Sequence, residues 1–187
     1  RKRVGVIDPL VISHRDYDHA SFLPHLVPRF RIGRVLLPPT TRTTDFGRRL
    51  VDFLEHRGLQ VVHFREGGRV ESGRLRCRVL HPDRRYAWEP DVSNNDRSLV
   101  FRCRYGGWSF LLPGDIQELA MQRLLEERRG VLKSDLVVLP HHGSATPVLR
   151  EFLKACDPAV AVVSCSAGCD ITGTRRICRE LEIPLWT

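Results

Sequence analysis

The chain has 187 residues, of which 42% are hydrophobic and 28% are charged. That is enough for a globular domain with a sizeable core, and no apolar run approaches the roughly 20 residues of a membrane span. The formal net charge of +8 favours polyanionic partners such as nucleic acid, anionic lipid or phosphorylated glycans. Nearly all of the basic residues are arginine, so codon bias is an alternative explanation of the charge.

Strand and helix patterns alternate along the chain and predict one mixed α/β domain over 1–187. The elements predicted in chain order are a strand at 10–13, a short helix at 20–30 broken by two prolines, a strand at 34–37, a helix at 45–57 capped by Thr44 or Asp45, a strand at 59–64, two short strands within 70–80, a hairpin of 98–104 and 108–112, a helix at 116–129, a strand at 136–139, a helix at 147–155, a strand at 159–164, a helix at 175–181 and a strand at 183–186. Strand-like sequence at both ends indicates a fragment of a longer polypeptide.

The six cysteines show no C-x-x-C pair and no zinc-finger spacing. Cys77, Cys103 and Cys165 lie in apolar strand-like runs, and we expect them to act as small buried hydrophobic residues. Cys165 and Cys169 have a C-x3-C spacing, which is weak evidence for a metal site or a disulfide. A reducing environment is the simpler expectation.

The segment 14–19 carries the strongest functional signal. Its sequence H-x-D-x-D-H places two imidazoles and two carboxylates directly after a buried strand, as His14, Asp16, Asp18 and His19. Such donors at a strand end favour a pair of metal ions in a cleft. The alternative is an Asx-rich turn in which Asp18 caps the following helix, which leaves both histidines unexplained.

Two further polar groups follow apolar strands. Asp115 comes after the run 110–114 and precedes a predicted helix, so its carboxylate is either a ligand or the N-cap of that helix. His141 and His142 follow the strand at 136–139, and an adjacent pair of histidines there favours metal ligands or phosphate contacts. A dinuclear hydrolytic site needs a carboxylate that can bridge two cations, terminal ligands, and open positions for water and substrate. The candidate ligands are His14, Asp16, Asp18, His19, Asp115 and His141.

The order of these blocks resembles the metallo-β-lactamase fold and, more narrowly, the hydrolase domain of the ComEC DNA-internalisation competence proteins. The blocks are H-x-D-x-D-H at 14–19, N-N-x-x-S at 94–98, L-x-G-D at 112–115 and L-P-H-H-G-S at 139–144. The resemblance covers nearly the whole chain and implies a four-layer αββα sandwich with the site at one edge.

The resemblance also implies roles for individual residues. His14 and Asp16 would hold one metal, and Asp18, His19 and one of the 141–142 histidines the other, with Asp115 as the bridge. Of that pair we expect His141 to be the ligand and His142 the substrate contact or proton donor. The catalytic residues would then be Asp18 and His142, and the substrate contacts Asn95, Ser98 and Ser144.

This sequence departs from the family pattern in several places. The N-terminal hairpin with which family members begin is expected to be missing. The G-H-P element near the end is replaced by a segment with Thr174 in place of the histidine, which puts full activity in doubt. Asp16 replaces a histidine of zinc-only relatives, and the added oxygen donor shifts preference toward Mn²⁺, although Zn²⁺ remains an option.

The residues therefore predict a metal-dependent hydrolase, and the resemblance implies that it cleaves DNA phosphodiester bonds during uptake. We expect two Zn²⁺ or Mn²⁺ ions, single-stranded DNA as substrate and no nucleotide cofactor. The resemblance alone implies a membrane-channel portion of the same parent protein as partner. The fragment itself is expected to be a soluble domain of that larger membrane protein. The alternatives are a metallohydrolase for a small ester, lactone or phosphodiester, and a non-catalytic DNA-binding module.

Overall fold

The computed structural model describes residues 5–187. The first part of the described chain contains β1 (Val6–Ile7), β2 (Leu10–Val11), α1 (Tyr17–Ala20), α2 (Leu23–Leu26), β3 (Arg31–Ile32), β4 (Arg34–Leu37), α3 (Asp45–His56) and β5 (Gln60–His63). The second part contains β6 (Arg69–Ser72), β7 (Leu75–His81), β8 (Val100–Tyr105), β9 (Trp108–Leu112), α4 (Glu118–Glu127), β10 (Leu136–Val138), α5 (Leu149–Cys156), β11 (Val160–Val162), α6 (Thr172–Glu180) and β12 (Leu185–Trp186). Short 3₁₀ turns lie at η1 (Thr41–Thr43), η2 (Tyr86–Trp88), η3 (Asn95–Arg97), η4 (Arg129–Val131) and η5 (His141–Gly143).

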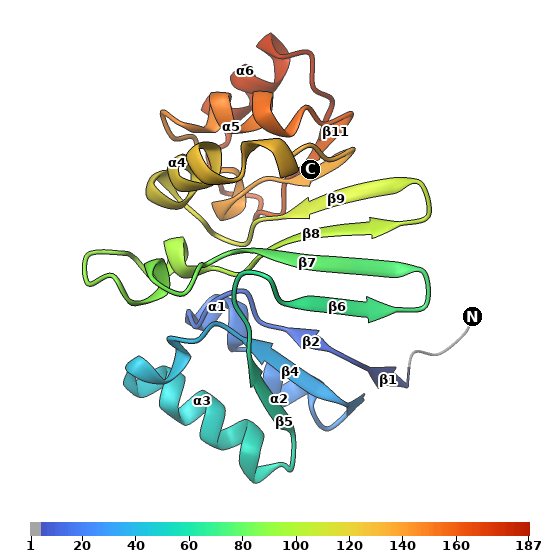
Figure 1. The fold of residues 1–187 in the computed structure, drawn as a ribbon, viewed down its shortest axis with the longest axis vertical. Coiled ribbons are helices and arrows are strands. Elements are labelled where there is room, and N and C mark those ends of the chain that lie inside the picture. Colours follow the sequence, from blue (N-terminus) through green and yellow to red (C-terminus); the bar gives the residue numbers. More distant parts are fainter. Residues whose placement is uncertain (1–4) are drawn as a thin grey trace.

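The strands form two main sheets, which Figure 1 shows one below the other. The smaller sheet is parallel with the order β2-β4-β5, and β1 pairs with β3 separately. The larger sheet has the order β12-β11-β10-β9-β8-β7-β6. It is antiparallel from β6 to β9 and parallel from β9 to β12. Because β9 and β10 are parallel neighbours, the segments that follow them leave the sheet at the same edge.

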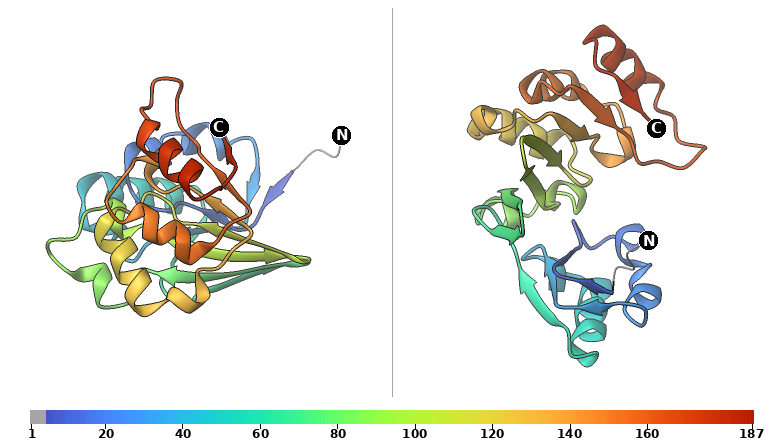
Figure 2. Two further views of the ribbon diagram at one scale, coloured as in Figure 1. Left: turned by 90° about the horizontal axis from the view of Figure 1, so that it is seen from above. Right: turned by 90° about the vertical axis from the view of Figure 1, so that its right-hand side faces the viewer.

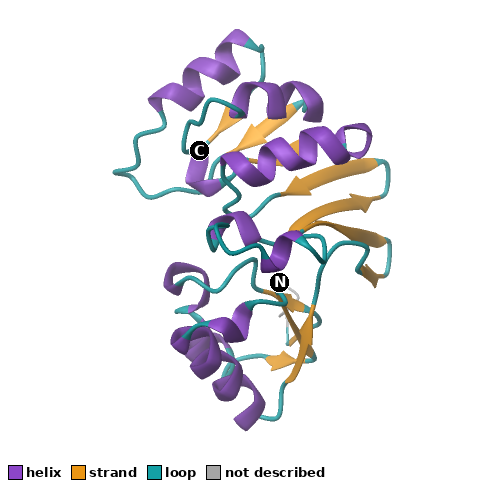
Figure 3. Cartoon of the chain, turned by 60° about the vertical axis from the view of Figure 1, so that its left-hand side comes forward, coloured by secondary structure: helices purple, strands orange, loops and turns teal. Residues whose placement is uncertain are grey.

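The core consists of three apolar layers, which define four layers of secondary structure. One core layer packs α1, α2 and α3 onto the smaller sheet, and another packs α4, α5 and α6 onto the larger sheet. The third lies between the two sheets and includes Leu36 of β4 and Val79 and Phe101 of the larger sheet. Figures 2 and 3 show the helices on the outer sides of the sheets. This arrangement is the αββα sandwich that the family resemblance implied.

Most of the predicted elements are present, and α3 illustrates why. Its N-cap is Thr44, whose side chain accepts a hydrogen bond from the backbone N–H of Gly47. Its buried residues include Leu50 and Leu54, which lie on one face of the helix. Of the predicted helix at 20–30 only the single turn α2 is present, and the single turn α1 ends where that helix was expected to begin. The pair β1 and β3 was not predicted.

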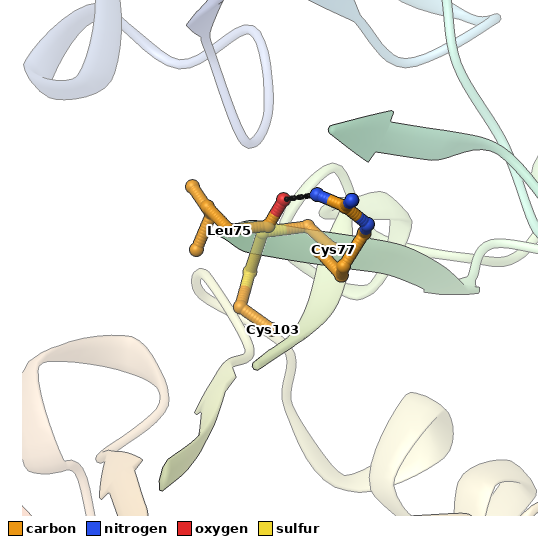
Figure 4. The surroundings of a disulfide bond; sticks show 4 residues. Leu75, Cys77 and Cys103 are labelled. Carbon is orange, nitrogen blue, oxygen red and sulfur yellow. Dashed lines mark hydrogen bonds between the residues drawn. A yellow bond between two sulfur atoms is a disulfide. The ribbon is translucent and has the colours of Figure 1, made fainter. Parts of the chain in front are cut away.

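The cysteines of the antiparallel strands differ from the prediction. Cys77 of β7 lies directly opposite Cys103 of β8, and the two are joined in a disulfide (Figure 4). Side chains at opposite positions of an antiparallel pair lie close together, and this register was not visible in the sequence. The expectation that these two cysteines are separate buried hydrophobic residues is therefore wrong. Cys165 is half-buried and its thiol is free.

Within residues 5–187, no helix combines the length and apolar character that crossing a membrane would require.

His81, at the end of β7, is a buried polar residue. Its Nε2 lies 2.6 Å from the backbone oxygen of Asp96, and its ring packs edge-on against Tyr86. Burial lowers the pKa of His81 from 6.5 to about 4. Folding therefore requires a neutral imidazole at this position.

We predict that His81 makes the fold sensitive to mild acid. The unfolded chain binds a proton at this residue below pH 6.5, whereas the folded chain does so only below about pH 4. The unfolding free energy should therefore fall by up to about 3 kcal/mol as the pH drops through this window. His81→Gln keeps an N–H donor but cannot titrate, so it should remove this part of the pH dependence in urea unfolding. The exposed His25 provides the control His25→Gln, and equal pH dependence of H81Q and the unmodified chain would contradict the prediction.

Candidate metal centre

Three segments meet at one edge of the sandwich to form the candidate site. They follow β2, β9 and β10, and so come from both sheets. The backbone oxygen of Ser13 accepts a hydrogen bond of 2.8 Å from the backbone N–H of Leu99, which directly precedes β8. This bond joins the segment after β2 to the larger sheet. This contact brings the H-x-D-x-D-H segment next to the ends of β9 and β10.

Four predicted site residues converge there: Asp18, His19, Asp115 and His142. One potential ligand atom of each lies within 4.8 Å of those of the other three. Nε2 of His19 is 3.2 Å from Oδ2 of Asp115 and 3.7 Å from Oδ2 of Asp18. Nε2 of His142 is 3.4 Å and 3.6 Å from the same two oxygens. A cation with four tetrahedral bonds of about 2.1 Å holds its ligands about 3.4 Å apart, so these distances fit a metal ion.

The histidine rings are oriented by contacts on their far sides. The hydroxyl of Ser13 lies 3.1 Å from Nδ1 of His14 and 3.2 Å from Nδ1 of His19. Nδ1 of His142 lies 2.8 Å from the backbone oxygen of Ser164, to which it can donate. In each ring Nε2 is therefore left for the centre of the site. This is the usual support of metal-binding histidines, in which the second nitrogen is held by an outer partner.

Nε2 of His19 gives an independent test of whether these residues suit a bound metal ion. This atom is buried, and among residues 5–187 it has no partner with hydrogen-bond alignment, although Oδ2 of Asp115 is close. A buried imidazole nitrogen without a partner is unfavourable. A divalent cation bound between His19, Asp18, Asp115 and His142 would satisfy it, so the residues present fit a metal.

Asp115 is positioned by the residues around it. Gly114 has φ of 60°, and a Cβ at this residue would lie 2.9 Å from Cβ of Ser98, so a glycine is needed for this close approach. The backbone N–H of Asp115 donates to the hydroxyl of Ser98 at 3.1 Å. These contacts turn the buried carboxylate toward the histidines.

Neither candidate carboxylate is a helix cap, so both capping alternatives are wrong. Asp18 lies inside α1, whose N-cap is Asp16. The N-cap of α4 is Gln117, two residues after Asp115. The cap comes from a distant segment instead. Oδ1 of Asp96 accepts hydrogen bonds from the backbone N–H groups of Gln117 and Ala120 at the start of α4.

The charges of the site are mutually dependent. The close contact with Asp115 raises the pKa of His19 and outweighs the effect of burial. Burial would raise the pKa of Asp115, but the nearby imidazoles, His19 first, lower it overall. Burial and then the charge of His19 lower the pKa of His14. The site therefore favours an ionised carboxylate facing positive charge, which a bound cation can supply.

His14 and Asp16 lie next to the four-residue cluster as a separate pair. Nε2 of His14 is 3.7 Å from Oδ2 of Asp16, and the rings of His14 and His19 have centroids 4.2 Å apart. The other oxygen of Asp16 accepts a hydrogen bond from Nδ2 of Asn94 at 3.0 Å. That this pair holds a second cation, with Asp115 as the bridge, stays a prediction.

The two adjacent histidines point to different surroundings. His142 joins the cluster, whereas Nε2 of His141 lies 3.4 Å from Nδ2 of Asn95 and its Nδ1 lies 3.2 Å from Nε2 of Gln117. Both backbones have positive φ, 46° for His141 and 54° for His142. The structure thus places His142 where the sequence analysis expected His141. Which of the two binds metal stays a prediction.

The three predicted substrate contacts have different environments. Asn95 is half-buried beside His141, and Ser144 is exposed at the end of η5. Ser98 is fully buried and holds the backbone of Asp115. Sequence reasoning missed the supporting role of Ser13, although this residue directly precedes the motif.

Thr174, which the sequence analysis singled out as a departure from the family pattern, lies beside the turn of the two histidines. Its side chain is fully buried, and its hydroxyl donates to the backbone oxygen of Gly143 at 2.6 Å. Gly143 directly follows the two histidines, and a Cβ there would lie 2.6 Å from Cγ2 of Val163. Thr174 therefore holds the turn that carries His141 and His142.

Curated relatives of this chain are competence proteins. ComE operon protein 3 of Bacillus subtilis is 25% identical over 164 residues, which are 87% of this chain and 20% of that protein. Competence protein ComA of Neisseria gonorrhoeae is 28% identical over 166 residues, 84% of this chain and 20% of that protein. The chain thus spans about a fifth of the length of these relatives. They confirm the resemblance to ComEC proteins, while no protein-family model matches the chain.

Solved structures show the fold. The diiron β-hydroxylase CmlA of Streptomyces venezuelae matches 97% of this chain and 44% of its own with a TM-score of 0.61 and 18% identity. A Parabacteroides distasonis protein assigned as a metal-dependent hydrolase matches 97% of this chain and 76% of its own with a TM-score of 0.60 and 12% identity. The metallo-β-lactamase fold protein YhfI of Bacillus subtilis matches 96% of this chain and 74% of its own with a TM-score of 0.57 and 8% identity. The metallo-β-lactamase fold is therefore confirmed, while likeness at these identities leaves the chemistry open.

We predict that Thr174 supports cation binding from outside the site. Thr174→Val keeps the shape but removes the donor to Gly143, which should lower the unfolding free energy by about 1–2 kcal/mol and weaken Mn²⁺ or Zn²⁺ binding about 10- to 100-fold. Thr174→Ser keeps the hydroxyl and is the matched control. Urea unfolding and calorimetric titration with metal measure both effects. Unchanged metal affinity in T174V would show that the turn does not need this hydrogen bond.

Proposed function

We propose that this chain is a divalent-cation-dependent hydrolase that cleaves phosphodiester bonds of DNA. The convergence of Asp18, His19, Asp115 and His142 on one point at the edge of the sandwich carries the proposal. The competence relatives and the net charge of +8 support DNA as the substrate. The chain would act as one domain of a longer competence protein, with a membrane channel elsewhere in that protein.

The residues divide into two proposed sets of ligands. Asp18, His19 and His142 would hold one cation and His14 and Asp16 the other, and the carboxylate of Asp115 would contribute to both. When bound, such cations lower the pKa of coordinated water toward neutrality and stabilise negative charge on the attacked phosphorus centre. The mixture of imidazole and carboxylate donors suits Zn²⁺ and Mn²⁺.

The chain's own groups have three tasks in this proposal. Ser13 and the backbone oxygen of Ser164 keep the Nε2 atoms of the histidines directed at the site. Ser98 and Gly114 keep the Asp115 carboxylate in place. His141 and Asn95, which lie side by side next to the cluster, would contact the substrate and hold a proton for the leaving group.

A second candidate function is favoured by a cavity of about 480 Å³ that borders the site. Asp18 and His19 line one part of it, and most of its remaining wall is apolar, including Val70, Leu75 and Phe101. A pocket of this size and character suits a small molecule. A metallohydrolase for a small apolar ester or lactone is therefore the alternative.

We predict metal-dependent cleavage of DNA that requires Asp115. EDTA should abolish cleavage of end-labelled single-stranded DNA, and Mn²⁺ or Zn²⁺ should restore it. Asp115→Asn should lower the rate of DNA cleavage at least about 10³-fold, because the substitution removes the negative charge of the carboxylate that faces both His19 and His142. Asp91→Asn, at an exposed carboxylate, is the control. Cleavage that survives EDTA or D115N would refute the proposal, and faster hydrolysis of p-nitrophenyl butyrate than of DNA would favour the small-ester alternative.

We predict that the two adjacent histidines have separable roles. His142→Ala should lower the metal content of the purified protein, measured by elemental analysis, or weaken metal affinity about 100-fold. His141→Ala should retain the metal and lose DNA cleavage. The opposite pattern, with metal lost only in H141A, would restore the assignment expected from the sequence.

A further inference from the structure

The outer face of β6, β7 and β8 carries a group of arginines that the metal centre does not use. Alternate residues of a strand point to opposite faces of its sheet. Val70, Val79, Phe101 and Cys103 belong to the core between the two sheets, so the residues between them point outward. The outward set, here called the arginine face, is Arg69, Arg76, Arg78, Arg102 and Arg104.

The strand register arranges the arginine face in two rows. Arg78 of β7 lies opposite Arg69 of β6 on one side and opposite Arg102 of β8 on the other. The second row consists of Glu71, Arg76 and Arg104. Neighbouring strands are about 4.8 Å apart, and alternate residues of a strand are about 7 Å apart. The backbone thus presents guanidinium groups at short, regular intervals in two directions.

Three of these arginines are uncommitted. Arg69, Arg78 and Arg104 are exposed and make no ion pair or hydrogen bond through their side chains with any residue from 5 to 187. Arg76 is paired with Glu71, with Nε 3.2 Å from Oε2. Arg102 is half-buried and donates to the backbone oxygen of Lys133.

The arrangement is unfavourable for the isolated fold. Like charges directly opposite each other on neighbouring strands destabilise a sheet, and two such pairs flank Arg78 alone. Burial and then the charge of Arg104 lower the pKa of Arg102, which reflects the same crowding. The one carboxylate in the rows, Glu71, cannot balance five arginines. A bound polyanion would relieve this repulsion.

The shape of the arginine face favours a nucleic acid strand over a membrane. The five arginines line a recess of about 280 Å³, with Val131 of η4 also in its wall. A bilayer presents its phosphates in a plane, whereas a phosphodiester strand can enter a recess. Guanidinium groups bind phosphate oxygens through paired N–H donors, and two rows of them exceed what one isolated phosphate needs.

We propose that the arginine face binds the phosphodiester backbone of a nucleic acid at a surface separate from the metal centre. It lies on the opposite face of β6, β7 and β8 from the apolar cavity that borders Asp18 and His19. The proposal goes beyond the hydrolytic function and does not depend on it, because binding here needs neither cation nor cleavage.

The test compares two triple variants with the same change in net charge. Arg69→Gln with Arg78→Gln and Arg104→Gln removes the uncommitted arginines. Arg29→Gln with Arg49→Gln and Arg179→Gln removes exposed arginines that lie outside the arginine face. Binding of a fluorescent single-stranded oligonucleotide of about 20 nucleotides is measured by anisotropy across salt concentrations, on the protein as purified and again with EDTA.

The first variant should weaken binding at least about tenfold at 0.1 M salt and reduce the magnitude of the salt-dependence slope by about 2, which corresponds to three lost phosphate contacts. The second variant should bind within about twofold of the unmodified chain. Equal weakening in both variants would overturn the proposal, because only net charge would then matter. Preferential loss of binding to phosphatidylglycerol vesicles would also overturn it, in favour of a membrane.

Two further readouts keep the result interpretable. The urea midpoint of the first variant should equal or exceed that of the unmodified chain, since repulsion is removed. If the triple variant does not fold, Arg78→Gln alone should still weaken binding several-fold, and unchanged binding in R78Q would contradict the proposal. Salt-dependent binding without any DNA cleavage would support the arginine face and refute the hydrolase proposal. DNA cleavage together with unchanged oligonucleotide binding by the first variant would support the hydrolase proposal and refute the arginine face.

Discussion

The buried carboxylate of Asp115 is the group on which the geometry of the site depends. Only 5% of this residue is exposed, and its Oδ2 lies within 3.4 Å of imidazole nitrogens from two distant segments. A buried carboxylate is strongly unfavourable unless positive charge and hydrogen-bond donors surround it. The imidazoles of His19 and His142 face this carboxylate, and a divalent cation bound between them would supply positive charge. The acid and the histidines are therefore compatible with folding only as a group.

The fold assembles this group through single polar contacts between segments far apart in the chain. The backbone of Ser13 binds that of Leu99, and the hydroxyl of Ser98 binds the backbone of Asp115. Asp96 caps α4 from outside the helix, and Thr174 holds the turn after the two histidines. Each contact satisfies a buried polar group, so each stabilises the fold and sets the position of a site residue at once. Residues outside the cluster of candidate ligands therefore determine where those ligands lie.

The parts of this structure that sequence could predict are those encoded by local patterns. The apolar face of α3, its cap at Thr44 and the glycine turn between β8 and β9 are readable because the residues that decide them are neighbours in the chain. The site motifs were readable because each follows a strand. The pairing of Cys77 with Cys103 was not, since it depends on strand register.

Tertiary contacts also decided the roles that sequence left ambiguous. Asp115 had the spacing of a helix cap, but a carboxylate from another segment takes that role and leaves Asp115 free for the site. His141 and His142 are adjacent and chemically identical, so no pattern could separate them. Their left-handed backbone conformations direct one ring to Asn95 and Gln117 and the other to Asp115. Such distinctions exist only once the chain is folded.

The fold by itself does not determine the reaction, because one fold carries many chemistries. A diiron β-hydroxylase shares it with this chain, and a donor set of two imidazoles and two carboxylates accepts iron, zinc or manganese. The surroundings of the centre are more informative. On β6, β7 and β8 the inward residues line an apolar cavity beside the site, and the outward residues form the arginine face. Because side chains alternate along a strand, the same three strands offer a small apolar molecule one surface and an anionic polymer the other. The two faces therefore raise separate questions, because the cavity bears on which molecule is hydrolysed beside Asp18 and His19, whereas the arginine face bears on which polymer is bound away from that site.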